Sequence, residues 1–140
     1  MKKVLSAILA VTLVVILAVP CFAATANENG MSPRYTYIKL LTANLTINES
    51  SGISTSKATC YSLSGYTVEI ECKLQQQTGS GWTTLKTWTA TGNGYANINK
   101  DWAVSSGHTY QVYITYRIRN TAGSLLESTT TTKSYVYPKR

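Results

Sequence analysis

The sequence predicts an all-β protein, a single antiparallel β-sandwich of seven to eight strands. Residues 109–118 alternate without a break between apolar and polar side chains, and one face of this stretch carries Tyr110, Val112, Ile114, Tyr116 and Ile118. This alternation indicates a β-strand with one buried face, which needs a second layer to cover it. From residue 34 onward the chain has no helical period, only short alternations separated by Gly, Asn and Ser. Both features favour two facing sheets.

The expected strands follow one another along the chain with short turns between them. A first strand over 35–41 continues after a kink at 44–48, and the later strands run over about 53–63, 66–77, 82–91, 95–101, 109–118 and 125–137. Turn residues separate them, such as Ser64-Gly65 and Gly92-Asn93-Gly94. The chain has no internal repeat and no domain linker.

Parity assigns the side chains of each strand to a face. In the third strand the inward set is Val68, Ile70, Cys72 and Leu74, whereas Glu69, Glu71 and Lys73 point outward. In the fourth strand, strict alternation places Trp82, Thr84, Lys86 and Trp88 on one face and Leu85 on the other. We therefore expect Trp82 and Trp88 to share a face.

The first residues are expected to be a cleaved signal peptide rather than part of the fold. Lys2 and Lys3 precede an apolar run over 4–19, and small residues then allow cleavage after Ala23 or Ala26. As a helix the run spans about 24 Å, short of the roughly 30 Å core of a bilayer, which argues against a membrane anchor. Attachment as a lipoprotein through Cys21 is a further alternative. We expect a signal peptide over 1–23, a disordered lead-in over 24–33 and a β-sandwich domain over 34–140.

Export would place the protein outside the cell or at the cell surface. The processed chain is about 115 residues, the size of one domain. It carries eleven Lys and Arg against six Asp and Glu, a net charge of +5. A positive surface favours anionic neighbours such as cell-wall polymers. The basic residues are spread singly, however, as on an ordinary solvated surface, so we expect no nucleic acid and no membrane partner.

Two cysteines remain after the signal is removed. Cys60 and Cys72 both fall on the inward parity of their strands, and the expected compartment permits disulfides. A bridge between them would stabilise the fold by roughly 3 kcal/mol in the chain-entropy model. We expect this disulfide; the alternative is two buried free thiols.

The entry to residues 109–118 resembles strand F of immunoglobulin-like and fibronectin-like sandwiches. The turn Gly107-His108-Thr109 leads into Tyr110, and in those families a tyrosine at this point packs inward and bonds back to the chain, forming a tyrosine corner. The resemblance implies this structural role for Tyr110. Val112 stands where antibody domains have their second cysteine, so the cysteines here would lie on strands B and C instead.

A second resemblance covers about residues 45–128. The step Ala58-x-Cys60, the pair Leu74-Gln75 followed by Gly81-Trp82 and Trp88, and the turn at 107–110 resemble a group of small exported immunoglobulin-like β-proteins of unknown function from Gram-positive bacteria. These motifs are structural rather than catalytic. The resemblance implies a fold and an address without an activity.

Residues that could carry catalysis are few. His108 is the only histidine, and at a strand entrance it is more simply a solvent-facing turn residue. Glu69 and Glu71 share the outward face about 7 Å apart, a spacing that would suit a glycosidase pair, but on an exposed strand they are more simply a charged surface. We expect no enzyme, no metal and no cofactor.

The aromatic residues are the remaining indication of a function. Trp82 and Trp88 on one face could stack against sugar rings, and outward-facing Tyr113, with Tyr135 and Tyr137, could extend an interaction surface. The alternative for both tryptophans is that they fill or cover the sandwich interior. We therefore predict a non-enzymatic exported module that binds an unknown protein or a cell-wall polymer, with a carbohydrate-binding module that uses the exposed aromatics as the second hypothesis.

Overall fold

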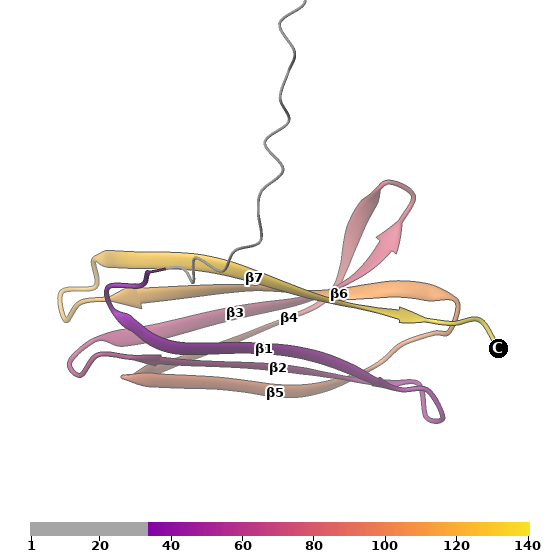
Figure 1. Ribbon diagram of the computed structural model, residues 1–140, viewed down its shortest axis with the longest axis horizontal. Helices are drawn as coiled ribbons and strands as arrows, with labels where there is room; N and C mark the ends of the chain where they lie inside the picture. Colours follow the sequence, from indigo (N-terminus) through magenta and orange to yellow (C-terminus); the bar gives the residue numbers. More distant parts are fainter. Residues whose placement is uncertain (1–33) are drawn as a thin grey trace, which may run out of the picture. The chain divides into compact units, whose positions relative to one another are not determined.

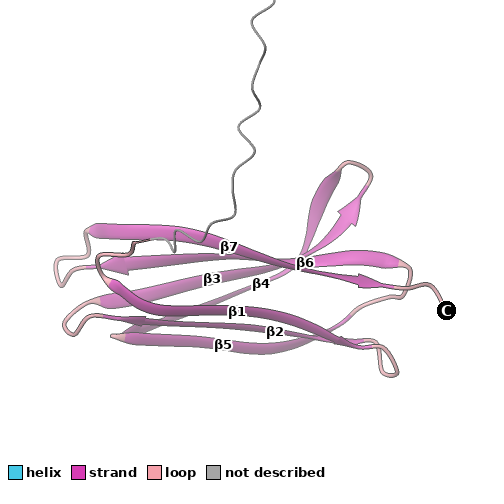
Figure 2. Cartoon of the chain, in the orientation of Figure 1, coloured by secondary structure: helices cyan, strands magenta, loops and turns pink. Residues whose placement is uncertain are grey.

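The computed structural model describes residues 34–140. The expected signal peptide over 1–23 and lead-in over 24–33 lie outside the described residues. All regular structure between residues 34 and 140 is β-strand, joined by short turns (Figure 2). This part of the chain accordingly contains no helix long and apolar enough to cross a membrane.

Between residues 34 and 140, seven strands form two antiparallel sheets, which confirms the predicted β-sandwich (Figure 1). The strands are β1 (Ile38–Asn48), β2 (Ile53–Ser62), β3 (Thr67–Thr78), β4 (Gly81–Asn93), β5 (Tyr95–Ala103), β6 (His108–Arg119) and β7 (Leu125–Tyr137). One sheet has the order β1-β2-β5 and the other the order β4-β3-β6-β7. The two expected segments at 35–41 and 44–48 form the single strand β1, whose register shifts between Ile38 and Leu40.

The fourth strand decides how the seven strands divide between the sheets. In constant-type immunoglobulin domains the fourth strand joins the sheet of the first two, whereas here β4 pairs with β3. Only Gly79 and Ser80 separate the paired residues Thr78 and Gly81, and so short a connection keeps β4 beside β3.

The chain then changes sheets through one residue, Gly94, between β4 and β5. Gly94 has a φ of 70°, in the region that favours glycine. The crossing is tight, because a Cβ atom on Gly92 would lie 2.1 Å from the carbonyl oxygen of Tyr95. This sharp crossing makes β4 and β5 the edge strands of the two sheets on the same side of the sandwich.

The core lies between the sheets, on the faces that the parity of β3 and β6 predicts. Its largest fully buried side chains include Tyr110, Tyr116, Ile70, Leu74, Ile114, Ile118, Val68 and Val112. The inward face of β2 is made of small residues: Ser54, Ser56, Ala58, Cys60 and Ser62. Small side chains on β2 therefore leave room for the bulky ones of β3 and β6, as close packing requires.

On the β1 and β7 side of the sandwich, two glutamates attach the edge strands to each other. The carboxylate of Glu127, on β7, accepts the backbone N–H groups of Thr36, Tyr37 and Ile38 at 2.9, 2.9 and 3.0 Å. At the opposite end, the hydroxyl of Tyr135 donates to the Glu49 carboxylate at 2.9 Å. On the side of β4 and β5 the described residues show no side-chain hydrogen bond between the two strands; the link there is the backbone of Gly94, which donates to the Tyr66 carbonyl at 2.8 Å and accepts the N–H of Ser62 at 2.9 Å.

Candidate functional site

Trp82 and Trp88 do not share a face, which corrects the expectation from strict alternation. Leu74 pairs with Lys86 but Gln75 pairs with Thr84, so Leu85 is the extra residue of a β-bulge. Because of this extra residue, the β4 side chains that precede Leu85 point to the face opposite to the one that strict alternation predicts. A single tryptophan platform on this hairpin is therefore ruled out.

The three tryptophans lie in different surroundings. Trp82 pairs with Gln77 near the tip of the β3–β4 hairpin, on the outer face of its sheet, and is exposed. Trp88 pairs with Cys72 and packs half-buried against the core. Trp102 lies at the far end of β5 with 39% of its surface exposed. Figure 1 shows the tip of the β3–β4 hairpin, the part of β4 that begins with Gly81 and Trp82, projecting away from the two layers.

Tyr110 forms the tyrosine corner that the resemblance implies. Its side chain is fully buried, and its hydroxyl donates to the carbonyl of Ser105 at 2.8 Å and accepts the N–H of the same residue at 3.1 Å. Burial raises the pKa of Tyr110, although the hydrogen bond to the Ser105 backbone opposes the shift. The residue therefore has a structural role: it fixes the connection between β5 and β6.

The expected disulfide between Cys60 and Cys72 is not formed in the structure. Both residues are free thiols with no exposed surface, on the inward faces of β2 and β3. Burial raises the pKa of Cys60 to about 11, with a further contribution from the negative charge of Glu127, and raises the pKa of Cys72 to about 12. Because the thiolate is the reactive form, these cysteines behave as small apolar core residues.

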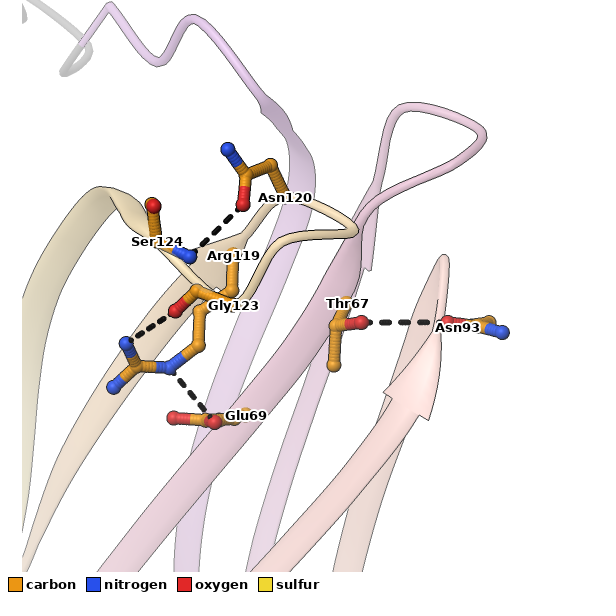
Figure 3. Close-up of polar contacts among 7 residues, drawn as sticks. All are labelled: Thr67, Glu69, Asn93, Arg119, Asn120, Gly123 and Ser124. Atoms are coloured by element: carbon orange, nitrogen blue, oxygen red, sulfur yellow. Dashed lines mark hydrogen bonds and ion pairs between the residues drawn. The ribbon is translucent and has the colours of Figure 1, made fainter.

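The groups weighed for catalysis are engaged in surface contacts. Glu69 accepts the Nε–H of Arg119 at 2.8 Å, and the same guanidinium donates to the carbonyl of Gly123 (Figure 3). Glu71 forms an ion pair with Lys73 at 3.2 Å. The ring of His108, which is exposed, shares a hydrogen bond of 3.2 Å with Gln76. Among residues 34–140, no group of three potential metal-ligating side chains lies close together.

The candidate tyrosines separate into an exposed and a structural group. Tyr113 points outward from β6, between Lys73 and Thr132, with 37% of its surface exposed. Tyr137 is buried and donates its hydroxyl to the carbonyl of Glu49 at 2.9 Å, next to the contact of Tyr135 with the same residue. Tyr135 and Tyr137 thus hold β7 to the β1–β2 turn, and of these three tyrosines only Tyr113 is exposed.

An exposed apolar row that alternation within single strands does not reveal crosses the outer face of the three-stranded sheet. Leu40 pairs with Tyr61, and Tyr61 pairs with Tyr95, so the three side chains lie side by side across β1, β2 and β5. Their exposed fractions are 53%, 43% and 40%. We call these residues the tyrosine row. In sequence, Tyr61 follows the inward-facing Cys60, and Tyr95 precedes the inward-facing Ala96. Because neighbouring side chains of a strand point to opposite faces, this parity could have placed both tyrosines outward.

The tyrosine row is held in a fixed arrangement. The rings of Tyr61 and Tyr95 lie 4.6 Å apart between centroids, at an interplanar angle of 39°. Asn97, next on the same face of β5, donates its side-chain N–H to the hydroxyl of Tyr95 at 3.0 Å. Aromatic pairs at this distance attract one another beyond the area that they bury. The row therefore presents an ordered surface.

A scan of the chain against protein-family models finds no match, and a search of curated proteins finds no similar sequence.

Proposed function

We propose that the chain is an exported, non-enzymatic interaction module, and that it binds its partner through the tyrosine row. The observation that carries this proposal is the register of Leu40, Tyr61 and Tyr95, which collects three large exposed side chains into one contiguous patch. Contiguous exposed apolar patches are typical of binding surfaces, whereas singly scattered apolar residues are ordinary.

Tyrosine suits such a surface for a physical reason. Its ring buries a large area at little cost in conformational entropy, and its hydroxyl keeps the free surface soluble. The ring contact between Tyr61 and Tyr95 reduces the entropy that binding would still have to remove. The expected signal peptide supports a partner outside the cell, which is either a protein or a cell-wall polymer.

The contacts of the ionisable groups support a role without catalysis. Glu69 and Glu71 are each paired with a cation on the outer face of the four-stranded sheet, and His108 contacts an amide. None of these contacts provides the activated nucleophile or the positioned base that catalysis needs.

Retention on purified cell walls tests the proposal. We expect the protein to be retained, and a Tyr61→Ser, Tyr95→Ser variant to lose at least about tenfold in affinity, the size of effect that interface tyrosines have. Tyr113→Ser is the matched control, because Tyr113 is similarly exposed but lies on the other sheet. Walls stripped of protein separate a protein partner from a polymer. Equal retention of the double variant, or no retention on either preparation, would contradict the proposal.

A further inference from the structure

A second surface lies where the edge strands β4 and β5 meet. Lys86 Nζ lies 5.0 Å from the centroid of the Trp102 ring, across the gap between the two sheets. Trp88 follows Lys86 on the same face of β4, and Lys100 precedes Trp102 on the same face of β5. We call these four residues the basic aromatic corner. Each edge strand thus contributes one basic and one indole side chain to the junction of the sheets.

The corner is accessible because each sheet ends there. Edge strands have a neighbour on one side only, so inward-facing side chains of β4 and β5 remain partly in contact with solvent. Lys100 and Trp102 are exposed, and Lys86 and Trp88 are half-buried. The tip of the β3–β4 hairpin projects away from the three-stranded sheet (Figure 1), and Trp102 keeps 39% of its surface exposed.

The charge of the corner is not neutralised by the protein. Among residues 34–140, neither Lys86 nor Lys100 forms an ion pair. Asp101 lies between Lys100 and Trp102 in sequence but on the opposite face of β5, where its carboxylate accepts the hydroxyl of Thr55 at 2.7 Å. The other carboxylates in this part of the chain are engaged elsewhere: Glu49, Glu69, Glu71 and Glu127.

We propose that the basic aromatic corner binds an anionic polysaccharide. The two ammonium groups match the carboxylate or phosphate groups of such a polymer, and the indole rings match the flat apolar faces of its sugars. The Trp102 indole already carries one cation over its face, which holds Lys86 at the surface of the corner. Single-stranded nucleic acid also combines anions with flat rings, but the expected export favours a wall polymer.

This inference does not depend on the tyrosine row. Tyr95 and Trp102 are seven residues apart on β5, or about 23 Å along the strand at roughly 3.3 Å per residue. They also lie on opposite faces of it, because Tyr95 pairs with outward-facing Tyr61 and Trp102 pairs with the buried Ser54. Substitutions in one surface can therefore be tested without altering the other.

The test compares the affinity of the purified protein for three probes: polygalacturonate, the same polymer with its carboxylates methyl-esterified, and a single-stranded oligonucleotide. We expect polygalacturonate to bind, and esterification to weaken binding at least about tenfold because it removes the charge. Raising the ionic strength from about 0.05 to 0.5 M should weaken binding to a similar degree through screening.

Variants locate the site. We expect the double variant Lys86→Gln, Lys100→Gln to lose at least about tenfold in affinity for polygalacturonate. We expect a similar loss in a separate single variant, Trp102→Ala. The matched control combines Lys57→Gln and Trp82→Ala, an exposed lysine and an exposed tryptophan outside the corner. The lysine variant removes only partly or fully exposed charges, so a thermal melt like that of the parent shows that the fold is kept.

Four outcomes would overturn the inference: no binding of polygalacturonate, equal binding of the esterified polymer, unchanged affinity of the lysine variant, and tighter binding of the oligonucleotide. If Tyr61→Ser, Tyr95→Ser abolishes polygalacturonate binding while the corner variants do not, the ligand belongs to the tyrosine row. The corner would then be excluded while the proposed function stands.

Discussion

The hydroxyl of Tyr110 forms two hydrogen bonds with the backbone of Ser105: it donates to the carbonyl at 2.8 Å and accepts from the N–H at 3.1 Å. Both backbone groups lie in the β5–β6 connection, which has no strand partner to satisfy them. One buried side chain thus takes the place of a sheet neighbour for this segment.

Tyr110→Phe should therefore destabilise the protein. Removing the hydroxyl leaves a backbone donor and a backbone acceptor without their partner, at a cost of about 1–3 kcal/mol in the free energy of unfolding. Urea unfolding measures the change. Tyr113→Phe is the control, because its ring is exposed on β6, and it should change stability by less than about 0.5 kcal/mol. Equal stability of the two variants would show that the tyrosine corner contributes nothing to the free energy of unfolding.

Ser54 and Ser56 form a matched pair for a second prediction. Both are fully buried on β2, but Ser54 Oγ donates to the carbonyl of Trp102 at 2.8 Å, whereas Ser56 Oγ has no hydrogen-bond partner. Ser56→Ala should stabilise the protein by about 1 kcal/mol, because it removes a buried unsatisfied hydroxyl. Ser54→Ala should destabilise it by a similar amount. Destabilisation by both substitutions would contradict the assigned hydrogen bonds.

The buried thiols predict a loss of stability at alkaline pH. In the unfolded chain a thiol titrates near pH 8.5, whereas burial holds the folded pKa of Cys60 at about 11 and that of Cys72 at about 12. Above about pH 9 the unfolded state releases protons that the folded state retains, so stability is full below pH 8.5 and falls as the pH rises toward 11.

The expected slope is at most about 1.4 kcal/mol per pH unit for each thiol. Urea unfolding of the reduced protein at pH 8 and pH 10 measures it. The slope should be smaller in Cys72→Ala, which lacks one of the two titrating groups. A stability that stays constant from pH 8 to pH 10 would contradict the burial of free thiols.

Glu127→Gln should release the segment before β1. The carboxylate accepts three backbone N–H groups, from Thr36, Tyr37 and Ile38, and a neutral amide oxygen accepts fewer and weaker hydrogen bonds. We expect faster hydrogen exchange at these amides and a loss of about 1–3 kcal/mol. Glu71→Gln, which breaks a surface ion pair with Lys73, should cost less than about 1 kcal/mol. Unchanged exchange at residues 36–38 would refute the attachment.

The fold was predictable because strand parity is a local property. The inward residues of β3 and β6 can be read from alternation alone, and the structure buries all of them. The bulge was not predictable, since Leu85 is an ordinary strand residue and nothing in its neighbours indicates the extra position. For that reason alone, strict alternation wrongly places Trp82 and Trp88 on one face.

The tyrosine row shows a different limit of sequence analysis. Parity assigns Tyr61 and Tyr95 to outer faces one at a time, but their adjacency depends on the pairing of β2 with β5, two strands separated by a change of sheet. Long-range pairing leaves no mark in local composition. The same holds for Lys86 and Trp102, which belong to different sheets.

Photo-crosslinking tests the central claim most directly. A benzophenone side chain replaces Tyr61 in one variant and Tyr113 in another, and each is exported by living cells. If the tyrosine row is the binding surface, position 61 forms a covalent adduct with a partner protein or with wall polymer on irradiation, and position 113 does not. Adducts at position 113 alone, or none at position 61, would contradict the account.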